Sequence, residues 1–142
     1  MEPLTHSVHP ILLPVSGTPI LAYTLEFLER GGVEEIFVLT SSPLEIQAYI
    51  ESSRWGEKGY PIKLRTISVP QARSTGDFMR ELDRRNLVKG DFVLLRGGVV
   101  SNLPLPSIVE EHQKRRESDK DAMLMSMVLM QTETHTAFSG RR

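Results

Sequence analysis

Apolar residues follow helical spacing in some parts of the chain and form continuous runs in others. Within residues 20–28 they are spaced to cover one wide face of a helix, and Gly31 and Gly32 follow where a left-handed residue often ends a helix. Thr18 is a candidate N-cap, with Pro19 at the first helical position. The pattern therefore predicts a helix that begins at Pro19 and ends before the two glycines.

A buried strand and a second helix are predicted next. Residues 36–39 are continuously apolar, which is typical of a strand buried on both faces. After this run, Ser42 is a candidate N-cap, Pro43 takes the first helical position, and Glu45 stands three residues after the cap. This spacing predicts a helix that starts with a capping box formed by Ser42 and Glu45.

A further strand and helix are predicted in the middle of the chain. Apolar residues nearly alternate over residues 62–67, which predicts a strand with one less buried face. Residues 74–91 then predict a short helix that buries Phe78, Met79 and Leu82 and turns its charged residues outward.

The last part of the chain is predicted to form a strand, a helix and another strand. Residues 92–95 are an apolar run that Gly97 and Gly98 end, which predicts a buried strand. An amphipathic helix is predicted within residues 105–121, followed by an apolar strand over residues 122–130. The methionines of this last run are predicted to fill the core.

The order of these elements indicates the fold class. Strands that alternate with helices pair in parallel through right-handed crossovers. The sequence therefore predicts an α/β, Rossmann-like fold with a mostly parallel sheet. The polar residues 131–142 are predicted to be a disordered tail.

Composition and charge narrow the class of protein. With 142 residues, 39% of them hydrophobic and 25% charged, the chain fits one soluble globular domain. Its net charge of -1 is unlike that of a DNA-binding protein, which usually has a basic face. It has no cysteine, no signal-peptide pattern and no apolar run of the roughly 20 residues that a membrane-spanning helix needs. We therefore expect a cytoplasmic protein that binds neither DNA nor membranes.

Few residues have the spacing of a catalytic or metal site. The chain has no G-x-G-x-x-G and no Walker loop, and it opens on a proline-rich segment, residues 3–19, instead of a strand. His6 and His9 are three residues apart, but no further ligand accompanies them. Ser74 and Thr75 have no histidine nearby in the sequence to activate a nucleophile. We therefore expect no catalytic residue, no cofactor and no metal ion.

Three segments resemble nucleotidyltransferases such as the sugar-nucleotide pyrophosphorylases. Residues 3–5 and 12–15 match the part of the family signature that follows its glycine-rich loop, and residues 94–102 match a strand that ends in Gly-Asp. The resemblance implies a three-layer nucleotidyltransferase-type fold in residues 1–130. It also implies that this domain is incomplete, because the family's first strand and glycine loop precede the matching residues.

Six further segments are similar to the epsilon-subunit family of eukaryotic translation initiation factor 2B. They are Tyr23–Leu28, Gly32–Leu39, Ser74–Asp77, Val99–Asn102, Glu111–Arg116 and Asp119–Leu124. The gamma subunits share the fold but resemble this chain less. The factor is a guanine-nucleotide exchange factor for the GTPase that delivers initiator tRNA. The resemblance implies that exchange depends on a separate C-terminal helical domain, which nothing in this chain resembles.

An architectural role is what this resemblance implies. The domain would pair with the gamma subunit, help to build the multi-subunit factor, and meet the GTPase only indirectly. Two other hypotheses stay open. One is an active nucleotidyltransferase that makes a nucleotide sugar, and the other is a non-functional fragment whose exposed strand edges threaten folding.

The resemblance also identifies remnants of an enzyme pocket. Where the family has Gly-Asp, this chain has Gly97 and Gly98, so the carboxylate that would hold a metal ion is absent. The other predicted remnants are Pro14, Ser74, Gly76 and Asp77. Taken without the resemblance, Gly97 and Gly98 are a tight turn, and Asp77 is a first-turn helix residue that suits the helix dipole.

Overall fold

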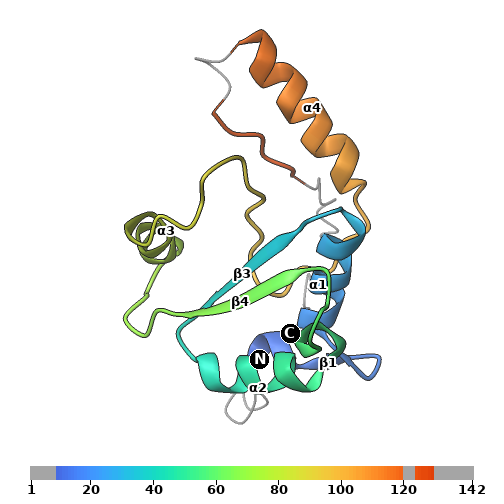
Figure 1. Ribbon diagram of the computed structural model, residues 1–142, viewed down its shortest axis with the longest axis vertical. Coiled ribbons are helices and arrows are strands. Elements are labelled where there is room, and N and C mark those ends of the chain that lie inside the picture. Colours follow the sequence, from blue (N-terminus) through green and yellow to red (C-terminus); the bar gives the residue numbers. More distant parts are fainter. Residues whose placement is uncertain (1–8, 120–123, 130–142) are drawn as a thin grey trace, which may run out of the picture. The chain divides into compact units, whose positions relative to one another are not determined.

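The computed structural model describes residues 9–119 and 124–129, which fall into two units (Figure 1). The first unit extends to Leu105, and the second begins at Pro106. The helices and strands are η2 (Pro10–Leu12), β1 (Pro14–Val15), β2 (Thr18–Pro19), α1 (Ile20–Arg30), β3 (Glu35–Thr40), α2 (Pro43–Ser52), η3 (Arg54–Gly56), β4 (Lys63–Ser68), α3 (Thr75–Arg84) and α4 (Leu105–Ser118).

Strands β3 and β4 form the parallel sheet that the order of elements predicts. Glu35 pairs with Lys63 at one end of the ladder and Thr40 pairs with Ser68 at the other. Helix α2 lies between the two strands in the chain, so β3, α2 and β4 form one β–α–β crossover. This confirms mixed α/β structure and parallel pairing, although the described residues place only two strands in this sheet.

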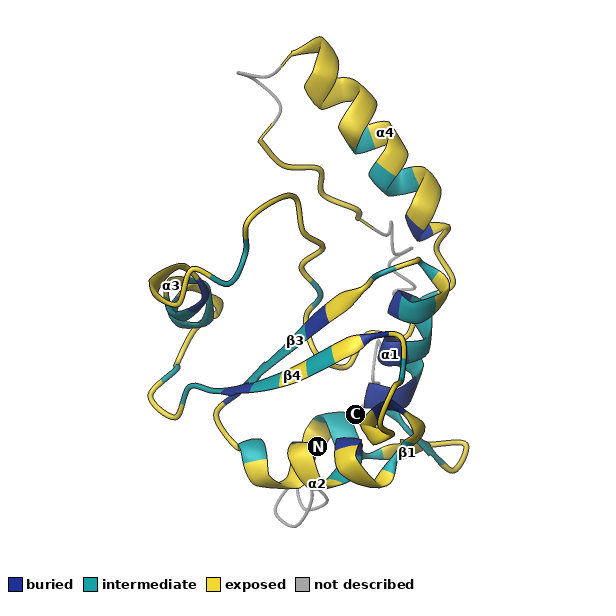
Figure 2. Ribbon diagram, in the orientation of Figure 1, coloured by how far each residue is buried: buried dark blue, intermediate teal, exposed yellow. Residues whose placement is uncertain are grey.

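The core of the first unit lies between these strands and their neighbouring helices. Three side chains are almost fully buried: Leu21 and Leu25 on α1, and Ile46 on α2. Figure 2 shows buried residues on α1 and on both strands of the sheet. The remaining buried apolar residues are Ala22, Leu28, Ile36, Ile50, Trp55, Ile62, Ile67, Leu82 and Leu105.

Strand β3 is less buried than its apolar sequence predicts. Ile36 is buried, but Phe37, Val38 and Leu39 are only half-buried. The prediction of burial on both faces is therefore wrong for the centre of the strand. The physical reason is that the described residues supply β3 with one neighbouring strand, so its side chains have fewer partners than those of a central strand.

The start of α1 differs from the prediction because of a short hairpin. Val15 pairs with Thr18 across a two-residue turn in which Ser16 and Gly17 both have positive φ, 51° and 81°. Two such residues make the type I′ turn that suits a tight hairpin. Thr18 therefore belongs to β2, and the N-cap position falls to Pro19, which makes no side-chain cap.

Helix α2 begins at Pro43 as predicted, but the predicted capping box is wrong. Ser42 occupies the N-cap position without a side-chain bond. Its backbone N–H donates instead to Thr40 Oγ1 at 3.0 Å, and Glu45 Oε2 accepts from the backbone N–H of His9 at 2.9 Å. Glu45 thus fastens the start of the described chain to α2.

Residues 92–95 do not form the predicted buried strand. They have no regular secondary structure, and Phe92, Val93 and Leu94 are 53%, 40% and 53% exposed. Residues 124–129 of the second unit also lack a strand, and Met125 and Met127 are exposed rather than filling a core. An isolated extended segment gains no ladder hydrogen bonds, and the described residues offer no strand edge that pairs with either one.

Several predictions fall on residues outside the described ranges. They are the remainder of the 122–130 strand, the tail 131–142, His6 and the Pro-Leu-Thr match at residues 3–5. In the part of the chain that the structure describes, no helix is long and apolar enough to cross a membrane.

Candidate functional site

The turn at Gly97 and Gly98, which resembles a lost metal site, lies next to η2. Gly97 is close to Ile11, since a side chain built at Gly97 would meet Ile11 Cδ1 at 3.4 Å. Gly98 has φ +84° and nothing within 4 Å of the position a Cβ would take. Gly98 therefore takes a backbone conformation that suits glycine, and there is open space where its side chain would be.

A buried threonine holds this turn against α1. The side chain of Thr24 is nearly buried, and its Oγ1 lies 2.9 Å from the carbonyl oxygen of Val99. The same hydroxyl lies 3.3 Å from the carbonyl of Ile20, so its single proton favours the shorter bond to Val99. Residues 97–99 are thereby fixed to the helix that follows the proline-rich segment.

This arrangement brings together two segments that are far apart in the sequence. Ile11 and Pro14 lie before α1, while Gly97 and Gly98 lie nearly ninety residues later. The backbone N–H of Ile20 donates to the carbonyl of Leu13 at 3.2 Å, which ties the proline-rich segment to α1 as well. These segments present backbone groups and apolar side chains, and Gly98 itself has no side chain that could bind a cation.

Ser74 and Asp77 cap helix α3. The backbone N–H groups of Arg73 and Ser74 donate to Asp77 Oδ2 at 2.8 and 2.9 Å, and the N–H of Asp77 donates to Ser74 Oγ at 3.3 Å. Arg80 forms an ion pair with the other carboxylate oxygen. The bond from the Arg73 N–H, with those from Ser74 and Arg80, lowers the pKa of Asp77 from 3.8 to about 2.

The bonds of this cap are local. Those of the Ser74 and Asp77 side chains stay within residues 73–80, and a Cβ at Gly76 would make only ordinary contacts with Arg80 and Ser74. None of these bonds reaches Gly97 or Gly98. The geometry thus shows that Asp77 is a first-turn residue of α3. The role of pocket remnants stays a prediction for Pro14, Ser74, Gly76, Asp77, Gly97 and Gly98. Within the described ranges, no group of three or more His, Cys, Asp or Glu residues could hold a metal ion.

A cluster around Arg54 was not predicted. Arg54 Nη2 lies 2.9 Å from Glu29 Oε2 and 3.2 Å from Glu26 Oε1, and its guanidinium stacks 4.6 Å from the centroid of the Trp55 ring. Tyr60 donates to Glu29, and this bond raises the pKa of Tyr60. The cluster fastens η3 to α1. The only signal in the sequence is the pair of glutamates three residues apart on one helix face.

Comparison with known proteins agrees with the predicted resemblance. A relative named "Translation initiation factor eIF2B subunit epsilon" from Schizosaccharomyces pombe is 43% identical over 129 residues, which cover 90% of this chain. The protein of the same name from Dictyostelium discoideum is 37% identical over 134 residues, or 94% of this chain. A gamma subunit of the factor from S. pombe is 30% identical over 108 residues, or 73% of this chain.

These relatives are much longer than this chain. The matched residues make up 19% of each epsilon subunit and 23% of the gamma subunit. The predicted resemblance to epsilon subunits is confirmed. The family model described as "Nucleotidyl transferase" matches residues 1–139, which is nearly the whole sequence. The chain therefore belongs to the nucleotidyl transferase family.

Proposed function

We propose that this chain is the nucleotidyltransferase-like part of a translation initiation factor subunit, and that it serves in subunit assembly instead of catalysis. Support comes from the epsilon-subunit relatives at 43% and 37% identity. The chain spans 19% of the length of those relatives, and the resemblance to them implies that guanine-nucleotide exchange depends on a separate C-terminal domain. Its expected location is the cytoplasm.

One observation carries this proposal, namely the apolar surface of residues 92–100. Phe92, Val93, Leu94, Val99 and Val100 are between 39% and 57% exposed. Five exposed apolar residues within nine positions of the chain indicate a contact site more strongly than isolated exposed residues do. Covering it with another protein would be favourable at about 25 cal/mol for each Å² of apolar area removed from water.

The chemistry of the turn at Gly97 and Gly98, within this segment, argues against nucleotidyl transfer. That reaction needs a divalent cation to neutralise the charge that develops on the phosphates. Gly98 stands where the resemblance implies the carboxylate for this cation, and it offers no ligand. The hypothesis of an active enzyme therefore has less support than the architectural one.

The gamma subunit is the partner that we propose. A gamma subunit is itself 30% identical to this chain, so the two subunits are expected to share a fold. Related domains of one complex can meet through equivalent surfaces, much as two copies do in a symmetric dimer. Other subunits of the factor would contact this pair, and the GTPase would be an indirect partner.

A binding experiment with purified gamma subunit tests the proposal. The full chain, tagged, is mixed with the S. pombe gamma subunit, and complex formation is measured by size-exclusion chromatography and titration. Leu94→Asp places a charge in the apolar surface, and we expect binding to weaken about tenfold or more. Leu44→Asp is the matched control, because Leu44 is 81% exposed on α2, outside that surface.

Two outcomes would contradict the assembly role. Absence of any complex with the unmodified chain would remove the proposed partner. Equal weakening by Leu94→Asp and Leu44→Asp would show that residues 92–100 are not the contact surface. A complex that only Leu94→Asp weakens supports the proposal.

The same exposed residues also favour a second candidate, a fragment that does not fold alone. The half-buried centre of β3 agrees with a sheet that continues beyond its two described strands. Urea unfolding followed by the fluorescence of Trp55, the single tryptophan, separates the two candidates. A cooperative transition supports a folded module, whereas a gradual change without a transition supports a fragment.

A further inference from the structure

Ser118 is an exposed hydroxyl at the end of α4. It is the last residue of the helix, and its Oγ donates to the carbonyl oxygen of Lys114 at 3.0 Å. This carbonyl lies one helical turn before Ser118, so the hydroxyl bonds back along its own helix, as serine side chains in helices often do. The side chain of Ser118 therefore lies on the surface of the helix instead of packing in a core.

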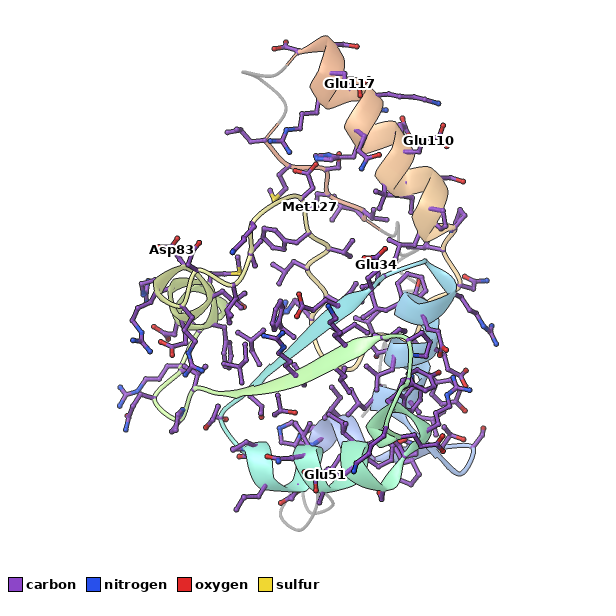
Figure 3. The ribbon with its side chains drawn as sticks, viewed as in Figure 1. Glu34, Glu51, Asp83, Glu110, Glu117 and Met127 are labelled. Carbon is purple, nitrogen blue, oxygen red and sulfur yellow. The ribbon has the colours of Figure 1, made fainter. Side chains whose placement is uncertain are left out.

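Two arginines stand directly before this serine. Arg115 and Arg116 occupy the third and second positions upstream of Ser118. The described ion pairs nearby lie on the surface, between Arg115 and Glu111 and, at 2.6 Å, between Lys114 and Glu110 (Figure 3 labels Glu110 and Glu117 on α4). Exposed pairs of this kind are worth roughly 0–1 kcal/mol, so a binding partner can exchange them for its own carboxylates at little cost.

We propose that Ser118 is a phosphorylation site, used by a protein kinase whose acidic substrate groove binds Arg115 and Arg116. In the reaction, Ser118 Oγ attacks the γ-phosphorus of a nucleoside triphosphate held by the kinase. The new Oγ–P bond forms as the bond from phosphorus to the β,γ-bridging oxygen breaks. The serine proton passes to the kinase's catalytic base, and nucleoside diphosphate leaves.

The position of Ser118 determines what the phosphate would do. Phosphorylation removes the Oγ–H that bonds to Lys114, and it adds a charge of roughly -1.5 to -2 at the negative end of the helix dipole. The added negative charge disfavours the last turn of α4. Phosphorylation is therefore expected to unwind the end of this helix, next to the segment that leads to residues 124–129.

A kinase assay on the full chain tests the site. The chain is incubated with ATP and the catalytic domain of a kinase that prefers arginine at the second and third upstream positions, and the modified residue is located by tandem mass spectrometry. Ser118→Ala should abolish incorporation, and the double variant Arg115→Gln, Arg116→Gln should slow it about tenfold or more. Ser107→Ala is the control, because Ser107 is exposed on the same helix without preceding arginines.

Structural and cellular readouts complete the test. The helical circular dichroism signal should fall slightly on phosphorylation of the unmodified chain and stay constant for Ser118→Ala. Chain recovered from eukaryotic cells in the presence of phosphatase inhibitors should be phosphorylated at Ser118. The proposal would be overturned if phosphate incorporation is unchanged in Ser118→Ala. It would also be overturned if only a kinase that recognises the downstream Asp119 phosphorylates the chain.

Discussion

Residues 36–39 and residues 92–95 carry similar apolar side chains in very different surroundings. The first run lies in β3, where each residue is matched with one of β4 in a parallel ladder. Ile36 at its start is only 7% exposed. The second run has no ladder among the described residues, and its Phe92 and Leu94 are each 53% exposed.

The difference between these runs lies in backbone pairing. A strand satisfies its N–H and C=O groups only through a neighbour, and its side chains are buried only when that neighbour carries a layer of helices. β4 and α2 provide this for β3. Residues 92–95 are instead anchored at one end, where Thr24 binds the carbonyl of Val99. An apolar run is thus free to become part of an interface when no strand of its own unit pairs with it.

The largest expected effect comes from truncating one residue in each run. Ile36→Ala should lower the free energy of unfolding by about 3 kcal/mol, because it leaves a cavity beside the core. Leu94→Ala should change it by less than about 0.5 kcal/mol, because its side chain is already half in water. Urea unfolding followed by Trp55 fluorescence measures both. Similar losses for the two variants would mean that residues 92–95 are buried in solution.

The second expected effect concerns Leu105, which ends the irregular segment that follows residues 92–95. Leu105, where this segment ends, packs against Gly31, and a Cβ at Gly31 would lie 2.5 Å from Leu105 Cδ2. Gly31→Ala should therefore destabilise the first unit by about 1–3 kcal/mol through overpacking.

Gly90 provides the control for this substitution. A Cβ at Gly90 would meet nothing within 4 Å, so Gly90→Ala should leave the urea midpoint nearly unchanged. If Gly31→Ala is also neutral, Leu105 is not held against the end of α1, and it does not anchor the segment that follows residues 92–95.

The third effect tests the anchor at Thr24. Thr24→Val keeps the shape of the side chain but removes the hydrogen bond to Val99, and it should cost about 1 kcal/mol. Thr24→Ser keeps the hydroxyl and should restore slow amide exchange in residues 97–100, which hydrogen exchange with mass spectrometry can follow. Equal exchange in both variants would show that the bond does not hold the segment.

Much of the fold was predictable because its signals are local. Helical spacing and the flanking glycines and prolines place α1 and α2 to within one residue at their start, and period-two spacing places β4. The hairpin before α1 was missed, although its Ser16-Gly17 turn is a recognised turn signal. Residues 92–95 were predicted wrongly, because whether an apolar run is paired depends on distant residues that local spacing does not report.

In the candidate site too, local contacts were predictable from the sequence and contacts between distant residues were not. The first-turn position of Asp77 was predictable from the local Ser-x-x-Asp spacing, and the structure shows the cap. The contacts of Gly97 with Ile11 and of Thr24 with Val99 join residues 75 or more apart, so spacing could not predict them. The Arg54 cluster was missed for the same reason, since Glu26 and Glu29 lie 28 and 25 residues before it.

The smallest expected effect is a pH dependence of the free energy of unfolding, and it comes from the cap at the start of α3. Because the pKa of Asp77 falls from 3.8 in the unfolded chain to about 2 in the fold, its carboxylate contributes stability that is fully present above pH 3.8. That contribution is lost as the pH drops through about 2. Asp77→Asn should therefore flatten the dependence of unfolding free energy on pH in this window.

The bonds of Asp77 lie at the protein surface, so the change should be small and should shrink further at high salt. Glu81 also titrates near pH 2, because bonds from Arg84 and Arg85 stabilise its carboxylate, and it accounts for the dependence that remains in Asp77→Asn. Asp83→Asn, an exposed change on the same helix, is the control. A carboxyl chemical shift of Asp77 that titrates near 3.8 in the folded chain would show that the cap does not persist in solution.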